Sequence, residues 1–220
     1  MRTIASLVIA LAVVASAEGK KTAAEWTSAD ELTITVRMEF YGKTSKSQVR
    51  AWEKGIEAAW NKDAVAEIEK DGKTRKVKLT IAVETRVRKE SDPPTEGWHE
   101  VKVVSGISEF VKTRLEKQKG QLIDGYRSWM WLGGKEEGDS GCWSNLIWPT
   151  VAAHEFGHVL GLDDEYDESA EWYMKPILGF IEDRPPSLMN LSWYPGSVAK
   201  PRHFKTIVEN VEKYGWSEKK

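Results

Sequence analysis

Two histidines stand four residues apart in the stretch HEFGHVLGLDDEYD, which spans residues 154–167, and an acidic residue follows the first of them. On a helix, positions four apart share one face, so the imidazoles of His154 and His158 can reach a single ion. Zinc accepts histidine nitrogen at about 2 Å and can lower the pKa of a bound water to about 7. Glu155 would lie beside that water and could take its proton. The spacing therefore predicts a zinc site that activates water.

A third protein ligand must come from outside this pair, because a catalytic zinc binds three protein groups and keeps one position open. On a continued helix, Asp164 would lie about 9 Å beyond His158 along the axis. Gly161 lets the helix end, since glycine adopts the left-handed conformation at little cost. We therefore expect a reversal that returns Asp164 to the ion. Its neighbours Asp163 and Glu165 stay open as alternative ligands.

The pattern H-E-x-x-H-x-x-G-x-x-D resembles the signature of the metzincin clan of zinc peptidases in its aspartate-ending form, similar to the small secreted proteases called snapalysins. Metzincins also have a methionine turn beneath the metal, and Ser187-Leu188-Met189 matches it in type and order. The resemblance implies a zinc endopeptidase with Glu155 as the catalytic base. It implies that the zinc ligands are His154, His158 and Asp164, supported by Gly161 and Met189.

Two positions depart from the commonest metzincin pattern. The third ligand is usually histidine, whereas Asp164 would add a negative charge; sites with two histidines and a carboxylate do support peptide hydrolysis. Some metzincins have a tyrosine two residues after the methionine, where this chain has Leu191 and, further on, Tyr194.

Several other residues have alternative interpretations. His203 could hydrogen-bond an oxyanion, cap the last helix or pair with a carboxylate. Cys142, the only cysteine, excludes an internal disulfide and could approach the metal, but we favour a buried small side chain. Met189 could be an ordinary core residue, and we expect His99 to be structural. The acidic run that begins at Asp163 could bind calcium but lacks the spacing of an EF-hand loop, which favours a solvated segment.

Alternating and helical patterns predict the elements that position this site. Apolar residues alternate over 31–40 and over 76–88, as in half-buried strands, with helical spacing from Val49 to Trp60 between them. This order implies a right-handed crossover between parallel strands. Residues 18–30 look like a tail, and Asp71-Gly72 marks a turn.

Later segments complete the expected domain. We expect strands at 98–104 and 126–132, and a mobile Gly-rich loop over 133–141. The motif helix opens at Pro149 or Thr150, and a final helix follows Pro201. The expected fold class is α/β (α+β), metzincin-like, with a twisted mixed sheet, a crossover helix, an active-site helix and an irregular C-terminal part.

The N-terminus has the layout of a signal peptide. Arg2 supplies a positive start, an apolar run covers 4–14, and Ala15-Ser16-Ala17 is a small-x-small site. We expect cleavage after Ala17 and a secreted or periplasmic protein. An uncleaved anchor is less favoured because the apolar run is short.

The bulk properties limit the possible partners. The chain has 220 residues, enough for one domain over 18–220, which we divide into 18–161 and 162–220. Its net charge of −2 becomes −3 once the single positive charge of Arg2 is removed, and it shows no basic stripe for nucleic acid. Beyond the N-terminus no segment approaches the roughly 20 apolar residues of a membrane span. We expect a monomer that acts on a peptide or protein.

Two other functions fit the same sequence. A non-catalytic zinc-containing binding or toxin-like module could use the same ligands. A secreted carbohydrate-binding or structural domain could use some of the eleven tryptophans as stacking platforms.

Overall fold

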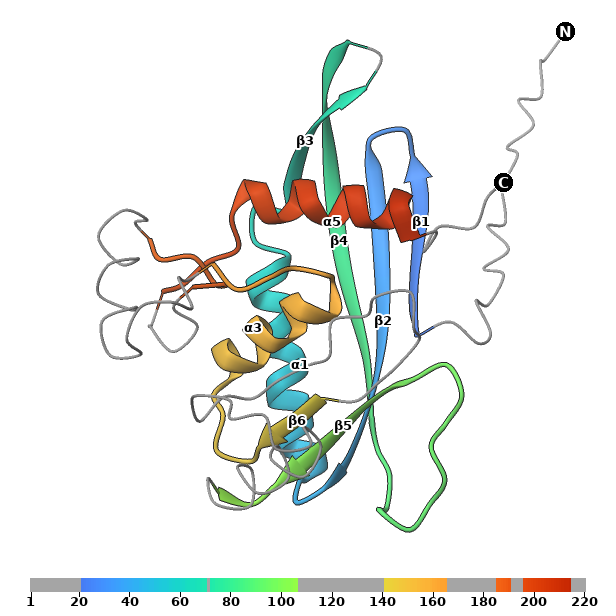
Figure 1. Cartoon of the computed structure of the whole chain (residues 1–220), viewed down its shortest axis with the longest axis vertical. Coiled ribbons are helices and arrows are strands. Elements are labelled where there is room, and N and C mark those ends of the chain that lie inside the picture. The colour runs from blue at the N-terminus through green and yellow to red at the C-terminus, as the bar shows by residue number, and fades with distance from the viewer. Residues whose placement is uncertain (1–20, 71, 107–140, 166–184, 191–195, 215–220) are drawn as a thin grey trace, which may run out of the picture.

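The computed structural model describes residues 21–70, 72–106, 141–165, 185–190 and 196–214, in which a mixed sheet packs against three helices (Figure 1). Several predictions lie outside these residues: the signal peptide, the strand at 126–132, nearly all of the loop at 133–141, Leu191 and Tyr194. None of the helices in the described part of the chain is both long and apolar enough to cross a bilayer.

The centre of the sheet is the long strand β2 (Glu31–Gly42), which pairs in parallel with β4 (Lys73–Val87). Both strands were predicted, and so was their parallel pairing. The predicted alternation is also present: every second side chain of the first part of β2 enters the core, namely Leu32, Ile34, Val36, Met38 and Phe40.

The other edge of β2 is shared by two strands placed end to end. β1 (Thr22–Ser28) pairs antiparallel with the first half of β2, and β5 (His99–Val104) pairs in parallel with the second half. His99 Nε2 lies 3.0 Å from Thr22 Oγ1, which links the two strands. Burial and the nearby charge of Lys21 lower the pKa of His99 to about 3. His99 therefore has the structural role that was expected.

Three strands were not anticipated. The prediction of a tail over 18–30 is wrong for β1, whose small residues give little hydrophobic signal. β3 (Val65–Lys70) forms an antiparallel hairpin with β4, in which Lys70 pairs with Lys73. The four-residue strand β6 (Gly141–Ser144) pairs in parallel with β5 and begins where the predicted loop ends. β6 has only four residues, the smallest number over which an alternation can be recognised.

The helices form the second layer. α1 (Lys46–Trp60) begins after Ser45, whose side chain accepts the backbone N–H of Gln48. α3 (Pro149–Val159) contains the histidine motif and lies beside α1, and α5 (Pro201–Tyr214) runs across the strands (Figure 1). One hydrophobic core includes residues from both sides of Gly161.

Candidate metal centre

The position of α3 is fixed by two buried tryptophans of α1. The Trp60 indole N–H donates to the carbonyl of Ala153 at 2.8 Å, and that of Trp52 donates to Ile147 at 3.2 Å, just before the helix. Glycine permits this close contact, because a Cβ on Gly55 would lie 2.3 Å from the Cβ of Pro149. The helix with the two histidines is therefore packed directly on the crossover helix.

The reversal expected at Gly161 is present. Gly161 has a φ of +78° and its N–H donates to the carbonyl of His158 at 2.9 Å. The next N–H, that of Leu162, reaches back to the carbonyl of Gly157 at 3.1 Å. These two bonds form a Schellman motif, which ends a helix and turns the chain back. On α5, the Asn210 amide donates to the carbonyls of Leu160 and Gly161, which fastens the reversal to the C-terminal helix.

The reversal brings Asp164 to the two histidines. Asp164 Oδ1 lies 3.1 Å from His154 Nε2 and 3.5 Å from His158 Nε2. The donor atoms of the three residues all lie within 4.8 Å of one another, and they form the one such group found in the described part of the chain. Ligands about 2.0–2.1 Å from a tetrahedral zinc lie roughly 3.3–3.4 Å apart, so both nitrogen–oxygen distances match that spacing.

Both imidazoles are oriented by backbone carbonyls. His154 Nδ1 donates to the carbonyl of Leu188 at 2.9 Å, and His158 Nδ1 donates to that of Leu162 at 2.7 Å. A carbonyl can only accept, so each Nδ1 holds a proton and each Nε2 is directed toward Asp164. This is the outer arrangement that protein-bound metal ions require of histidine ligands.

The electrostatics of the three groups favour a positive charge between them. Burial lowers the pKa of His158, but the hydrogen bond with Asp164 and the charges of Glu155 and Asp164 outweigh burial and raise it to about 9. Burial raises the pKa of Asp164, but the hydrogen bonds and charges of the two histidines hold it well below its usual range. A cation bound here would gain the same attraction.

Glu155 and Met189 are both buried close to the two histidines. Glu155 is 3% exposed and close enough to His158 for its charge to raise the pKa of that histidine. Met189 is fully buried against the motif helix at Gly157, where a Cβ would lie only 2.4 Å from the methionine sulfur. Gly157 therefore allows Met189 to approach the helix between the two histidines.

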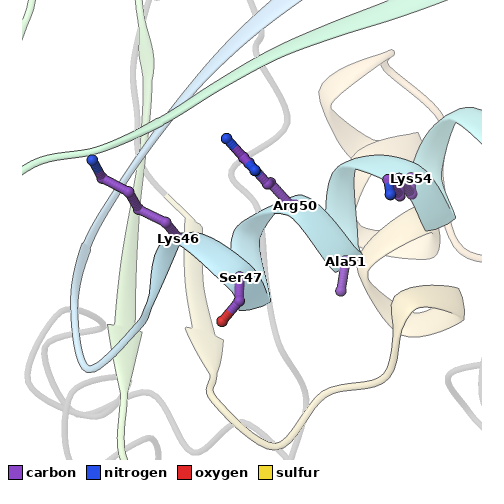
Figure 2. Close-up of a pocket in the computed structure, with 5 residues that line it drawn as sticks. All are labelled: Lys46, Ser47, Arg50, Ala51 and Lys54. Carbon is purple, nitrogen blue, oxygen red and sulfur yellow. The ribbon is translucent and has the colours of Figure 1, made fainter.

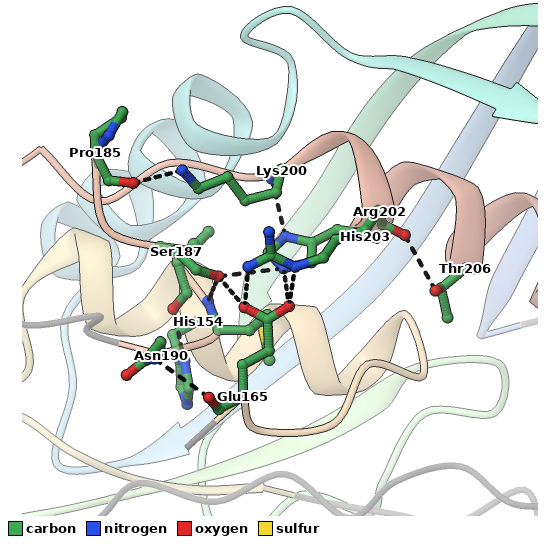
Figure 3. A network of polar contacts seen from close by, with 11 residues as sticks. His154, Glu165, Pro185, Ser187, Asn190, Lys200, Arg202, His203 and Thr206 are labelled. Atoms are coloured by element: carbon green, nitrogen blue, oxygen red, sulfur yellow. Dashed lines mark hydrogen bonds and ion pairs between the residues drawn. The ribbon is translucent and has the colours of Figure 1, made fainter. Parts of the chain in front are cut away.

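The alternative ligands Asp163 and Glu165 lie outside the donor group. Asp163 is exposed. The Glu165 carboxylate is bound by Arg202 and His203 of α5 and by the Ser187 hydroxyl (Figure 3). Among the described acidic neighbours, the geometry singles out Asp164 as the third donor.

His203 is buried and does what two of its three interpretations proposed. Its Nδ1 accepts the backbone N–H of Lys200 at 3.1 Å beside the start of α5, and its Nε2 lies 3.0 Å from Glu165 Oε1. Because Nδ1 accepts, Nε2 holds the proton and donates it to the carboxylate. Both ring nitrogens are thus engaged within the protein, so the structure gives no support to the oxyanion interpretation.

Cys142 is buried in β6 and does not join the group of three metal-binding candidates. The pocket in Figure 2 lies on the exposed face of α1 and contains none of the three candidate metal ligands. It is lined by Lys46, Ser47, Arg50, Ala51 and Lys54.

Sequence reasoning missed how the site is held in place. It assigned no partner to Glu165 and no role to Arg202 or Asn210. The one available signal was the basic pair Arg202-His203 at the start of a helix, in a chain with an acidic run after the motif. Comparison of the chain with protein-family models, curated proteins and solved structures finds no match.

Proposed function

We propose that this protein is a zinc-dependent endopeptidase, metzincin-like in its site and secreted after cleavage near Ala17. The observation that supports the proposal best is the convergence of two imidazole nitrogens and one carboxylate oxygen beside a buried glutamate. The residues present suit zinc, because two histidines and a carboxylate leave a fourth tetrahedral position open.

His154, His158 and Asp164 would hold the ion. When bound, zinc would acidify a water molecule and polarise the peptide carbonyl. Glu155 would take a proton from the attacking water and pass it to the leaving amine, which is general acid–base catalysis by one carboxylate.

Zinc analysis and peptide digestion test the proposal. The purified protein should contain one zinc per chain, cleave members of a broad peptide library, and lose cleavage after treatment with a chelator. Glu155→Gln should keep stoichiometric zinc and lose most of the activity, on the order of 100-fold or more. Glu67→Gln, on the exposed part of β3, is the matched control and should be fully active.

The outcomes also separate the two alternative functions. Stoichiometric zinc with no cleavage of any peptide would favour a non-catalytic zinc module. Absence of zinc would favour a carbohydrate-binding or structural domain. That last alternative requires exposed tryptophans, whereas Trp52, Trp60 and Trp143 are buried in the core; Trp148 is 60% exposed.

A further inference from the structure

Glu165 lies where the chain segment 162–165 meets Ser187 and Asn190 of the segment 187–190 (Figure 3). Its backbone N–H donates to the carbonyl of Met189 at 2.9 Å, and its own carbonyl accepts from Asn190 Nδ2 at 3.2 Å. These two hydrogen bonds hold the segment 162–165 against the segment 187–190.

The side chain of Glu165 ties this junction to the start of α5. Arg202 binds both carboxylate oxygens, with Nε at 2.5 Å from Oε1 and Nη2 at 2.7 Å from Oε2. His203 Nε2 lies 3.0 Å from Oε1, and the Ser187 hydroxyl donates to Oε2. The same hydroxyl accepts the backbone N–H of Met189 at 3.2 Å, so the carboxylate also fixes the turn that contains the methionine.

The positions of all three candidate metal ligands depend on the two segments that meet at Glu165. Asp164 is the residue directly before it. His158 is oriented by the carbonyl of Leu162, and His154 by the carbonyl of Leu188. A shift of either segment would therefore turn an imidazole or move the carboxylate away from the other donors.

We propose that Glu165 is a positioning residue for the metal centre: through Arg202, His203 and Ser187 it sets the geometry of the three donors and hence the affinity for zinc. It acts through its neighbours and not as a ligand. The inference rests on the zinc site of the proposed function and is independent of peptide hydrolysis.

The partners of Glu165 should contribute differently to the stability of the metal centre, because their side chains differ in solvent exposure. Arg202 is 52% exposed, and an ion pair in contact with water contributes little. His203 is 3% exposed and Ser187 is 1% exposed, and His203 Nε2 lies 3.3 Å from the Ser187 hydroxyl oxygen. Removal of the carboxylate would leave His203 only this longer contact and would leave the buried Ser187 O–H without its acceptor, which is more costly. Loss of Glu165 should thus disturb the centre more than loss of Arg202.

Zinc affinity measured on the full chain by chelator competition tests the inference, with the visible spectrum of the Co²⁺-substituted protein as a second readout. Loss of an outer partner typically weakens metal binding 10- to 100-fold, so we expect about that increase in Kd for Glu165→Ala, with an altered cobalt spectrum. Glu165→Gln keeps one carbonyl oxygen, which can accept from either His203 or Ser187 in its present position, and should recover part of the affinity. Arg202→Met should raise Kd by up to about fivefold.

Lys205→Met is the matched control for Arg202→Met, since it removes a cation from the same helix; its ammonium lies 4.0 Å from Glu209. The Kd of this variant should equal that of the wild type. A merely structural role for Glu165 would lower thermal stability and leave both zinc Kd and cobalt spectrum unchanged, which would overturn the inference.

Two further outcomes keep the inference and the proposed function distinguishable. If Glu165→Ala does not fold, Ser187→Ala and Arg202→Met replace it, and wild-type Kd values in both would overturn the inference. A wild-type protein that binds zinc and cleaves no peptide contradicts the peptidase proposal alone, and weakened zinc binding in Glu165→Ala would still support the positioning role.

Discussion

Substitution of Gly161 by alanine should damage both the stability of the fold and the metal centre. A left-handed backbone costs an alanine about 1–2 kcal/mol. The smaller entropy of the unfolded alanine chain offsets about 0.4–1 kcal/mol of this. The backbone conformation alone therefore lowers the free energy of unfolding by about 1 kcal/mol.

The surroundings of Gly161 add a second cost. The new Cβ would lie 2.6 Å from Asn210 Nδ2, well inside contact distance. If Asn210 moves away, its hydrogen bonds to the carbonyls of Leu160 and Gly161 are lost, at roughly 0.5–1.5 kcal/mol each. The total loss should reach about 2–4 kcal/mol.

Gly72→Ala is the matched control. Gly72 has a φ of +70°, close to that of Gly161, and a Cβ there meets nothing within 4 Å. Urea unfolding of the two metal-free variants should show a loss of about 1 kcal/mol for Gly72→Ala and two to four times that for Gly161→Ala. The zinc Kd should rise at least about 10-fold for Gly161→Ala and should not rise for Gly72→Ala, since it is the reversal at Gly161 that holds Asp164 beside the histidines. Equal losses of stability, or wild-type zinc affinity in Gly161→Ala, would refute the reasoning.

Three further predictions concern other parts of the molecule. Asp164→Asn keeps the size of the side chain but removes the anionic donor, so zinc Kd from chelator competition should rise by more than about 10-fold. Gly157→Ala should cost about 1–3 kcal/mol in urea unfolding by overpacking, and the same substitution should cost less when it is made in a Met189→Ala variant, which lacks the sulfur that the new Cβ would meet. The pKa of His99 is lowered from 6.5 to about 3 in the fold, so the unfolded state binds the extra proton and stability falls as the pH drops below 6.5; by pH 5 this amounts to up to about 2 kcal/mol. His99→Gln should lack this component when unfolding free energies at pH 7 and pH 5 are compared.

The donor group could be predicted from the sequence because its geometry is local. Helical spacing places His154 and His158 on one face, and the left-handed glycine returns Asp164 over only six residues from His158. The long strands β2 and β4 could also be predicted from the sequence, since each contains enough alternating apolar residues for the pattern to be recognised.

The interactions that hold His154, His158 and Asp164 in place could not be predicted, because they join residues that are distant in the sequence. Arg202 is 37 positions from Glu165, and Leu188 is 34 positions from His154. An arginine at position 202 and a leucine at position 188 do not indicate which residue they contact. A backbone carbonyl is present at every position, so the sequence cannot show which one accepts a hydrogen bond. Such contacts appear only when tertiary packing brings the segments together.

If the chain binds zinc as proposed, the closeness of the three ligand residues in the sequence would affect how zinc binding and folding are coupled. All three donors lie within residues 154–164, so a denatured chain still presents two imidazoles and a carboxylate to the ion at short loop-closure cost. A ligand that also binds the denatured state raises the melting temperature less than its native affinity would suggest. Zinc present during refolding would therefore bind early to the segment 154–164 of the unfolded chain. The further increase in zinc affinity on folding would come from the backbone carbonyls of Leu188 and Leu162, which orient the imidazoles of His154 and His158.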